Sequence, residues 1–466
     1  MNSETIAAIS TALSESGIGI IRVSGSEAVD IVNKIFVNPG GRHILKDVAT
    51  HTIHYGFIVD PRDESIHIDE CLVSVMLSPR SFTAEDVVEI NCHGGVFVVK
   101  KVLSEVLKAG ARLAEPGEFS KRAFLNGRID LTEAEAVMDV ISSKSDMALR
   151  SSLSQLSGSV SSKIKELRKD ILYNIAFIES ALDDPEHISL DGYNEKLSGS
   201  LSGWISDIQK LIKSNDRGRF LREGINTVLL GKPNVGKSSI MNMLIGEDRA
   251  IVTDIAGTTR DTLEEYIKLG DMGLNLTDTA GLRDADNKVE QIGVDRARKA
   301  AENADLILYV IDATEKLTIG DISVYIDMMD TFSDKKGIIL LNKSDAKKSD
   351  VLLPDELLSH DYPVIEFSAL NGDGLDKLEI TIGYMFADGI NKNTDEVVIT
   401  NIRHRQCLEE CLQSLMNVRN SVEMEMEEDF YSIDLMDAYS SLGKIIGEEI
   451  EDDLATEIFS KFCLGK

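Results

Sequence analysis

The spacing of apolar residues changes along the chain and predicts regions of different architecture. Short apolar runs with strand character occur before residue 120, at residues 19–23, 54–59, 71–77 and 86–90. His93-Gly94-Gly95 then breaks the pattern before a predicted helix from about Val96 to Ala109. From about 118 to 213 the spacing is helical, with a stripe at Val160, Ile164, Leu167, Ile171, Ile175, Ile178 and Leu182. Strand and helix patterns alternate over residues 225–382, and helical spacing returns from Ile402.

This order favours an α/β domain inserted into a helical domain, because insertions are tolerated at exposed loops; two independent helical domains are the alternative. We expect a multidomain protein with α+β and α/β parts. The predicted boundaries are an N-terminal α+β domain at 1–119, a discontinuous helical domain at 120–222 and 380–466, and a doubly wound α/β domain at 223–379.

Composition is typical of a soluble globular protein, with 43% hydrophobic and 27% charged residues. No apolar run approaches the roughly 18 residues of a membrane span, and Met1–Thr5 lacks the features of a signal peptide. We therefore expect a cytoplasmic protein with no membrane partner. The net charge of −30 disfavours nonspecific nucleic-acid binding by the whole surface, but it leaves room for a local basic patch or a basic partner.

The cysteines do not form a paired framework, so we expect reduced thiols. Cys407 and Cys411 are four residues apart on a predicted helix, but no second pair of Cys or His completes a zinc site.

Residues 231–238 match the phosphate-loop pattern G-x-x-x-x-G-K-[ST] between a predicted strand and a predicted helix. Such a loop wraps phosphates with backbone N–H groups, and the helix N-terminus adds a positive dipole end. Lys237 is expected to reach the β- and γ-phosphates and contribute to catalysis, while the Ser238 hydroxyl holds Mg²⁺. The predicted nucleotide contacts of this loop are Asn234, Val235, Gly236, Lys237, Ser238 and Ser239.

A second motif, Asn342-Lys343-Ser344-Asp345, follows the apolar run 337–341. The Asp345 carboxylate can accept two hydrogen bonds from the guanine N1–H and amino group, which adenine does not offer, so the motif selects GTP. Ser368 and Ala369 follow another apolar run and would present a backbone N–H to the guanine carbonyl.

Two further motifs lie between these. Asp278, Thr279, Ala280 and Gly281 supply a carboxylate on the Mg²⁺ side and an N–H near the γ-phosphate. The segment 256–261 offers Thr259 as a Mg²⁺ ligand. Four motifs in this order predict a GTPase.

Three positions outside the shared motif pattern bear on how hydrolysis is accelerated. Leu282 stands where Ras-like enzymes carry the glutamine that orients the attacking water. Asn234 is either a ligand of a monovalent cation that stabilises developing charge or a side chain that tightens the loop. Glu290 is either the residue that orients water or a solvated loop carboxylate.

The whole chain resembles the MnmE (TrmE) family of tRNA-modification GTPases. The resemblance is carried by residues 19–25, 82–89 with His93-Gly94-Gly95, 116–126, 252–261 and the terminal 462–466. It implies a homodimer with an N-terminal tetrahydrofolate-binding domain, a helical domain and an inserted Ras-like GTPase domain. It also implies that an MnmG (GidA)-type flavoprotein carrying FAD is the partner. Together they would place an aminomethyl or carboxymethylaminomethyl group on carbon 5 of the wobble uridine of certain tRNAs.

The resemblance further implies which residues act in GTP hydrolysis. K⁺ would be held by Asn234, Thr253, Ile255 and Thr258 and would drive the GTPase domains together, and Glu290 would orient the water. The implied nucleotide contacts outside the phosphate loop are Thr253, Asp254, Ile255, Ala256, Gly257, Thr258, Thr259, Asp278, Thr279, Ala280, Gly281, Asn342, Lys343, Asp345, Ser368 and Ala369.

For a tetrahydrofolate derivative (5-formyl- or methylene-tetrahydrofolate), the resemblance points to Arg22, Glu89, Arg128 and Lys466. The arginines could pair with carboxylate or formyl oxygens, and Glu89 could accept from pterin N–H groups. Arg128 stands where related sequences often carry lysine, and Leu464 where they usually carry isoleucine. Cys463 is either a participant in the chemistry or a packed thiol of the tail.

Two other functions share part of this pattern. A ribosome-assembly GTPase has the same nucleotide motifs but usually carries a KH-like RNA module or a basic tail, whereas residues 423–429 here are acidic. A stand-alone one-carbon transferase with a regulatory GTPase domain would act without a flavoprotein.

Overall fold

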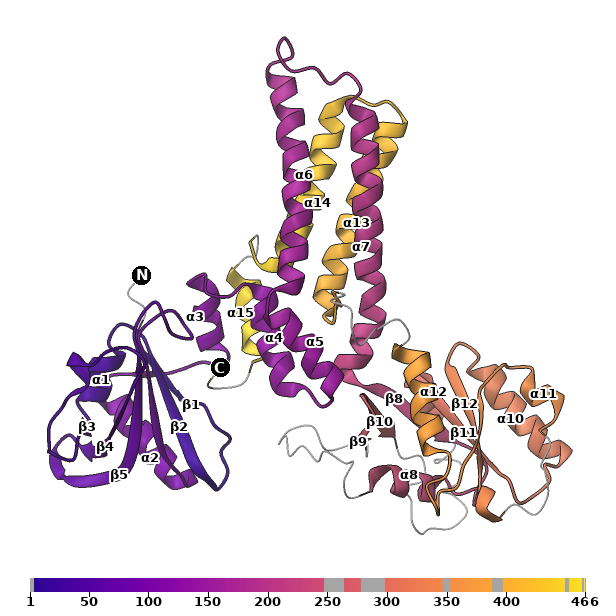
Figure 1. Cartoon of the computed structure of the whole chain (residues 1–466), viewed down its shortest axis with the longest axis horizontal. Helices are drawn as coiled ribbons and strands as arrows, with labels where there is room; N and C mark the ends of the chain where they lie inside the picture. Colours follow the sequence, from indigo (N-terminus) through magenta and orange to yellow (C-terminus); the bar gives the residue numbers. More distant parts are fainter. Residues whose placement is uncertain are drawn as a thin grey trace. The chain divides into compact units, whose positions relative to one another are not determined.

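The computed structural model describes residues 4–246, 264–277, 298–346, 353–387, 397–448, 452–462 and 465 (Figure 1). The chain separates into two compact units. Unit 1 comprises Met1–Met138, Gln155–Leu172 and Tyr439–Lys466, and unit 2 comprises Asp139–Ser154 and Tyr173–Ala438.

Unit 1 contains a sheet in the order β3-β4-β5-β6-β2-β1-β7, antiparallel except for the parallel pair β1–β7. Its strands are β1 (Ile6–Ile9), β2 (Ser16–Ser24), β3 (Phe36–Val37), β4 (Thr52–Asp60), β5 (Asp63–Met76), β6 (Val87–Gly94) and β7 (Arg112–Leu113). Helices α1 (Ala28–Asn33) and α2 (Val96–Ala109) share its core, and a short 3₁₀ helix lies at Leu45–Asp47.

The four strands predicted in this region are present. The predicted break at His93-Gly94-Gly95 is only partly correct, because β6 continues through Gly94 and Gly95 alone caps α2. An added Cβ at Gly94 would lie 2.3 Å from Ser16 Oγ. The absence of a side chain there is therefore explained by close strand packing rather than by a turn.

The helical part consists of long helices, as the spacing predicts. They are α3 (Glu118–Leu125), α4 (Leu131–Ser142), α5 (Asp146–Leu156), α6 (Ser159–Asp183), α7 (Tyr193–Glu223), α13 (Ile402–Glu423), α14 (Glu428–Ile446) and α15 (Asp452–Ser460). In α6 the predicted stripe is buried from Val160 to Ile178, but Leu182 is 42% exposed. The buried stripe ends one turn before the helix does. Cys407 and Cys411 are buried in α13 as free thiols, as predicted.

Unit 2 contains a second sheet in the order β13-β12-β11-β8-β10-β9, parallel except for the antiparallel edge strand β9. Its strands are β8 (Ile225–Leu230), β9 (Glu264–Leu269), β10 (Met272–Thr277), β11 (Leu306–Asp312), β12 (Lys336–Asn342) and β13 (Val364–Glu366). The helices beside it are α8 (Lys237–Ile245), α10 (Ile319–Thr331), α11 (Asp355–Leu358) and α12 (Leu375–Ala387), and a 3₁₀ helix lies at Ser344–Ala346.

Alternate residues of these strands enter two different cores, one with α8 and α12 and one with α10 and α11. Both faces of the sheet are thus covered, which confirms the doubly wound class. The carboxyl ends of β8 and β12 therefore open at the same edge, where loops of such sheets bind ligands.

The chain leaves α7 at Glu223 and enters β8 at Ile225, and later passes α7 again at Ile399. An added Cβ at Gly218 would lie 2.0 Å from the Ile399 carbonyl oxygen, so glycine permits this contact. This geometry suits an inserted domain, but the three-domain division stays a prediction. Helix α12 in fact continues past residue 379, with Ile382 and Phe386 in the core of the second sheet.

Among the described residues, no helix combines the length and apolar character needed to cross a membrane.

Candidate guanine-nucleotide site

The phosphate loop joins β8 to α8 and has the local conformation that its sequence requires. Gly236 is the residue before the helix and has a φ of +98°, and an added Cβ there would lie 2.2 Å from Asn342 Nδ2. Glycine is therefore needed for both the dihedral angle and the space. The first N–H groups of α8 have no acceptor within the helix, so they can bind an anion, as in a phosphate loop.

The Lys237 ammonium binds two carbonyl groups of its own loop. Its Nζ donates to the carbonyl oxygens of Gly231 at 2.8 Å and Lys232 at 2.7 Å. Burial lowers the pKa of this ammonium. A phosphate would give the partly desolvated cation a full negative charge to pair with, so the geometry fits the predicted phosphate contact.

Asn342 ties the phosphate loop to the guanine-side loop. Its Nδ2 donates to the Val235 carbonyl at 2.8 Å, and its Oδ1 accepts from the Ala369 N–H at 3.2 Å. The residue is 1% exposed. Asn342 thus joins two loops that are predicted to contact the nucleotide, which the motif alone does not show.

Lys343 lies beside the phosphate loop with a φ of +64°. Its Nζ pairs with Asp312 at the end of β11 at 2.6 Å and donates to the Asn234 carbonyl at 3.1 Å. We did not predict a role for Asp312 in this site from the sequence. Its position at the end of the apolar run 306–311 was the signal that could have indicated one. The pKa of Asp312 is lowered by Lys343 and Thr314 against the opposing effect of burial.

Asp345 is oriented by the loop that follows β13. The Ser368 hydroxyl donates to its Oδ1 at 2.6 Å, and Ser368 is fully buried. Fixing one carboxylate oxygen in this way sets the direction of the carboxylate toward a base. Asp345, Ser368 and Ala369 are thus brought together, as the motifs predict, while Asn234, Ser238 and Ser239 are exposed at the other side of the loop.

Other predicted nucleotide and folate residues lie outside the described residues. These are Thr253, Asp254, Ile255, Ala256, Gly257, Thr258, Thr259, Asp278, Thr279, Ala280, Gly281, Glu290 and Lys466, together with Leu282, Cys463 and Leu464.

The predicted folate residues of unit 1 meet around an aromatic ring. Arg22 Nε donates to Glu89 Oε1 at 2.8 Å, across the β2–β6 pair that places these residues opposite each other. The guanidinium carbons of Arg22 and Arg128 lie 5.3 and 5.4 Å from the Phe82 ring centroid. Arg22 Nη1 is buried without a hydrogen-bond partner in the described part of the chain. Such a donor needs an acceptor, so the cluster fits an anionic or carbonyl-bearing ligand.

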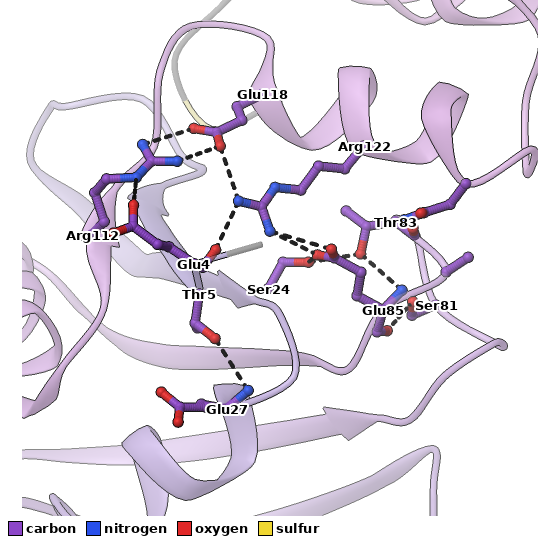
Figure 2. Close-up of polar contacts among 12 residues, drawn as sticks. Glu4, Thr5, Ser24, Glu27, Ser81, Thr83, Glu85, Arg112, Glu118 and Arg122 are labelled. Carbon is purple, nitrogen blue, oxygen red and sulfur yellow. Dashed lines mark hydrogen bonds and ion pairs between the residues drawn. The ribbon is translucent and has the colours of Figure 1, made fainter. Parts of the chain in front are cut away.

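A neighbouring network connects the motif at 82–89 to the motif at 116–126 (Figure 2). Arg122 donates from Nη1 to both Glu85 oxygens, and from Nη2 to Glu118 at 3.0 Å and the Glu4 carbonyl at 2.8 Å. Arg112 pairs with Glu118 at 2.6 Å and with Glu4 at 2.9 Å. Ser24 also donates to Glu85 at 2.8 Å. The two motifs are thus partners in one ion network centred on the buried Arg122, which the sequence pattern did not indicate.

A cavity of about 430 Å³ adjoins this network in unit 1. It carries charges of both signs, and its lining includes Arg112, Glu118, Lys121, Arg122, Thr456 and Phe459. In the described part of the chain, no group of three or more His, Cys, Asp or Glu side chains is arranged to hold a metal ion.

A doubly wound sheet with a phosphate loop and a carboxylate oriented for guanine defines a guanine-nucleotide-binding protein. Comparison with protein families identifies the family within this class. The model of the GTP-binding protein TrmE N-terminus matches residues 5–128, and that of the MnmE helical domain matches residues 131–463. The chain is 50% identical to the tRNA modification GTPase MnmE of Lachnoclostridium phytofermentans, over 100% of both chains. It is 46% identical to that of Enterococcus faecalis, over 100% of this chain and 99% of the relative. The chain belongs to the MnmE (TrmE) family of tRNA modification GTPases.

Solved structures give shorter matches. Aquifex aeolicus Era bound to GDP·AlF₄⁻ is 25% identical over 41% of this chain and 66% of that one, with a TM-score of 0.27. The G domain of the Thermotoga maritima FeoB iron transporter is 27% identical over 34% of this chain and 97% of that one, with a TM-score of 0.26.

Proposed function

We propose that this chain is a K⁺-dependent GTPase that modifies the wobble uridine of certain tRNAs together with an MnmG-type flavoprotein carrying FAD. The product is a 5-aminomethyl or 5-carboxymethylaminomethyl group. GTP hydrolysis and tRNA modification follow from membership of the family; the cation, the partner and the product are the proposal. The observation that supports the nucleotide part is the Ser368–Asp345 hydrogen bond of 2.6 Å, which fixes one oxygen of the carboxylate that the motif assigns to guanine.

In this proposal GTP binds with Mg²⁺ at Ser238 and Thr259. Lys237 neutralises the β- and γ-phosphates, and Glu290 orients the attacking water. K⁺ at Asn234, Thr253, Ile255 and Thr258 supplies positive charge where the transition state develops negative charge. Asn234 supports the cation site, because its φ of +64° and exposed position in the loop leave its side chain accessible to a ligand.

The first experiment compares GTP turnover in K⁺ and Na⁺ buffers. We expect hydrolysis to be faster in K⁺, because the GTPase domains of a homodimer come together on the cation. Equal rates in the two buffers would remove the cation from the proposal. Glu290→Ala should lower turnover while GTP affinity stays near that of the wild type, and parallel losses would count against its role.

The tetrahydrofolate derivative is assigned to Arg22, Glu89 and Arg128, with Lys466 as a further partner. The buried, unpaired Arg22 Nη1 supports this assignment, since a ligand oxygen would satisfy it. Calorimetric titration with 5-formyl-tetrahydrofolate tests it. Arg22→Ala should weaken binding by about 10-fold or more, because a charge-assisted hydrogen bond is lost. Arg62, an exposed arginine in the turn between β4 and β5, supplies the control variant Arg62→Ala.

The wobble-uridine role is tested in cytoplasmic tRNA from cells that lack the protein. Nucleoside analysis should show that the carbon-5 group is missing and that it returns with the wild-type chain. Normal tRNA together with a ribosome-assembly defect would favour the alternative, a ribosome-assembly GTPase. One-carbon transfer by the isolated chain without a flavoprotein would favour a stand-alone transferase.

A further inference from the structure

Helix α14 carries two apolar stripes, and only one of them is buried. The buried stripe has the three- and four-residue spacing of a helix face that packs in a core, and its members are Tyr431, Leu435 and Ala438. The other stripe has three-residue spacing, and its members are Phe430, Ile433 and Met436, which are 49%, 64% and 42% exposed. Because the first stripe already supplies the packing face, the apolar character of the second needs another explanation.

The neighbouring helix α13 has the polar outer face that is usual for a helix at a protein surface. Every exposed residue of α13 from Gln406 to Glu423 is polar. Among the described side chains of α14, the exposed ones are the three of the second stripe and Asp437. Two methionines of the connecting turn are exposed as well. We call these five apolar residues the α14 patch: Met424, Met426, Phe430, Ile433 and Met436. Exposed apolar residues gathered in this way mark an interaction surface.

The turn that presents the two methionines is hydrogen-bonded on both sides. The Tyr431 hydroxyl donates to the Met426 carbonyl at 2.7 Å, and the Met426 N–H donates to the Ser421 carbonyl at 3.0 Å. The Met424 N–H donates to the Asn420 carbonyl at 3.0 Å. The backbone under the patch is therefore preformed, which lowers the ordering entropy that a partner would otherwise have to offset on binding.

The segment that carries the patch is acidic throughout. Residues 423–437 contain no lysine or arginine, and their acidic residues are Glu423, Glu425, Glu427, Glu428, Asp429, Asp434 and Asp437. A second copy of this chain would place the same acidic segment against itself, and nucleic acid or an anionic membrane would add phosphate charge. These three occupants are therefore disfavoured. The complementary surface is a protein segment with apolar side chains flanked by lysine and arginine.

We propose that the α14 patch is the docking surface for the flavoprotein partner, which binds it through an amphipathic segment with basic residues beside apolar ones. Phe430 and Ile433 are the apolar anchors, and the flexible methionines adapt to the shape of the partner. The acidic residues attract the basic segment and orient it. The net charge of −30 also favours a basic partner, which would contact the tRNA phosphates. This inference rests on the proposed function, since it names where the proposed partner binds.

The first test measures binding of a purified MnmG-type flavoprotein to the full-length chain by biolayer interferometry. Phe430→Gln and Ile433→Gln each remove an apolar anchor, add no charge and keep a good helix former. Each should weaken the Kd about 10-fold or more, the usual effect of losing an anchor at an interface. Tyr173→Gln is the matched control, because Tyr173 is an apolar residue of α6 that is 72% exposed. It should leave the Kd within about twofold of the wild type.

The second test concerns the acidic residues. A triple variant with Glu423→Gln, Glu425→Gln and Glu427→Gln removes three charges and keeps the size of each side chain. It should slow association with the flavoprotein and make the association rate less dependent on salt concentration. A purely structural role of these residues would change thermal stability and leave the salt dependence as it is in the wild type.

Thermal melting shows whether each variant is folded, and GTP turnover by the chain alone should stay within about twofold of the wild type. Wild-type Kd values in Phe430→Gln and Ile433→Gln would overturn the proposal. Dissociation of a dimer in Ile433→Gln, measured by sedimentation velocity, would assign the patch to a second copy, and loss of tRNA binding by the chain alone would assign it to RNA. Either result would also overturn the proposal.

Failure of this inference differs from failure of the proposed function. If the wild-type chain does not bind the flavoprotein, the proposed partner is wrong and its docking surface with it. If the wild type binds and the patch variants bind equally well, only the docking surface is wrong. The K⁺ requirement and the tRNA product are judged on the wild type alone.

Discussion

Asn342 donates a hydrogen bond from its side chain to the main-chain carbonyl of Val235 over 2.8 Å. Val235 belongs to the phosphate loop, and Asn342 opens the motif that selects guanine. The phosphate loop and the loop predicted to recognise guanine are therefore joined by a side-chain hydrogen bond. Because the other side-chain atom of Asn342 accepts from Ala369, one buried amide orders three loops.

Asn342→Ala should lower both GTP affinity and the stability of unit 2. Truncation leaves the Val235 carbonyl and the Ala369 N–H without their partner, at a cost of about 1–3 kcal/mol. If this free energy is lost from GTP binding, the Kd for GTP rises roughly 10- to 100-fold. Titration with a fluorescent GTP analogue measures the Kd. Asn371→Ala, which removes an exposed side chain from the adjacent loop, is the control and should bind GTP normally.

Asp345→Asn should change the base that is selected. The amide has one acceptor oxygen where the carboxylate has two, and its NH₂ cannot accept from guanine, so GTP affinity should fall roughly 100-fold. Xanthosine triphosphate carries a carbonyl where guanine carries an amino group, and the asparagine NH₂ can donate to it, so its affinity should rise. Competition between the two nucleotides measures this. A variant with lower affinity for GTP and no higher affinity for xanthosine triphosphate would show that Asp345 stabilises the fold and does not recognise the base.

The sequence predicted the elements of the nucleotide site better than the contacts that organise it. The strand before the phosphate loop and helix α8 after it follow from apolar spacing and local glycine chemistry, which are properties of neighbouring residues. The Asn342 bridge and the Asp312–Lys343 pair join separate strand ends of the sheet. No spacing rule predicts such pairs, because they depend on strand order.

The same distinction holds in unit 1. Helix α2 was predicted with its observed limits, whereas the strand before it was predicted to end at Ile90 and in fact continues to Gly94. Gly94 has no room for a side chain because Ser16 on β2 packs against it. A local sequence pattern cannot reveal this contact, because the two residues lie on different strands. Likewise, the motifs at 82–89 and 116–126 are related by the Glu85–Arg122 ion pair across a long stretch of chain.

Arg122→Met should strongly destabilise unit 1. Arg122 is 8% exposed, and its loss leaves Glu85 and Glu118 close together without their shared cation. Removing one partner of a buried pair costs about 3–5 kcal/mol. Urea unfolding followed by circular dichroism measures the loss. Arg62→Ala breaks a pair whose arginine is 78% exposed and should unfold at the same urea concentration as the wild type.

His93 should titrate above its ordinary range because Asp69 holds it. The Asp69 carboxylate lies 2.7 Å from His93 Nδ1 and also accepts from the His93 backbone N–H at 2.8 Å. The hydrogen bond to Asp69, followed by its charge, raises the pKa of His93. A raised folded-state pKa means that the protonated pair stabilises the fold fully below the unfolded histidine pKa of about 6.5, and that this contribution is lost as pH rises through the folded value.

NMR titration of the imidazole C–H signals should therefore give His93 a pKa above that of a free histidine. Asp69→Asn should return it toward the ordinary value, because the amide keeps the polar contact but removes the charge. An unchanged His93 pKa in Asp69→Asn would show that the pair does not control its protonation.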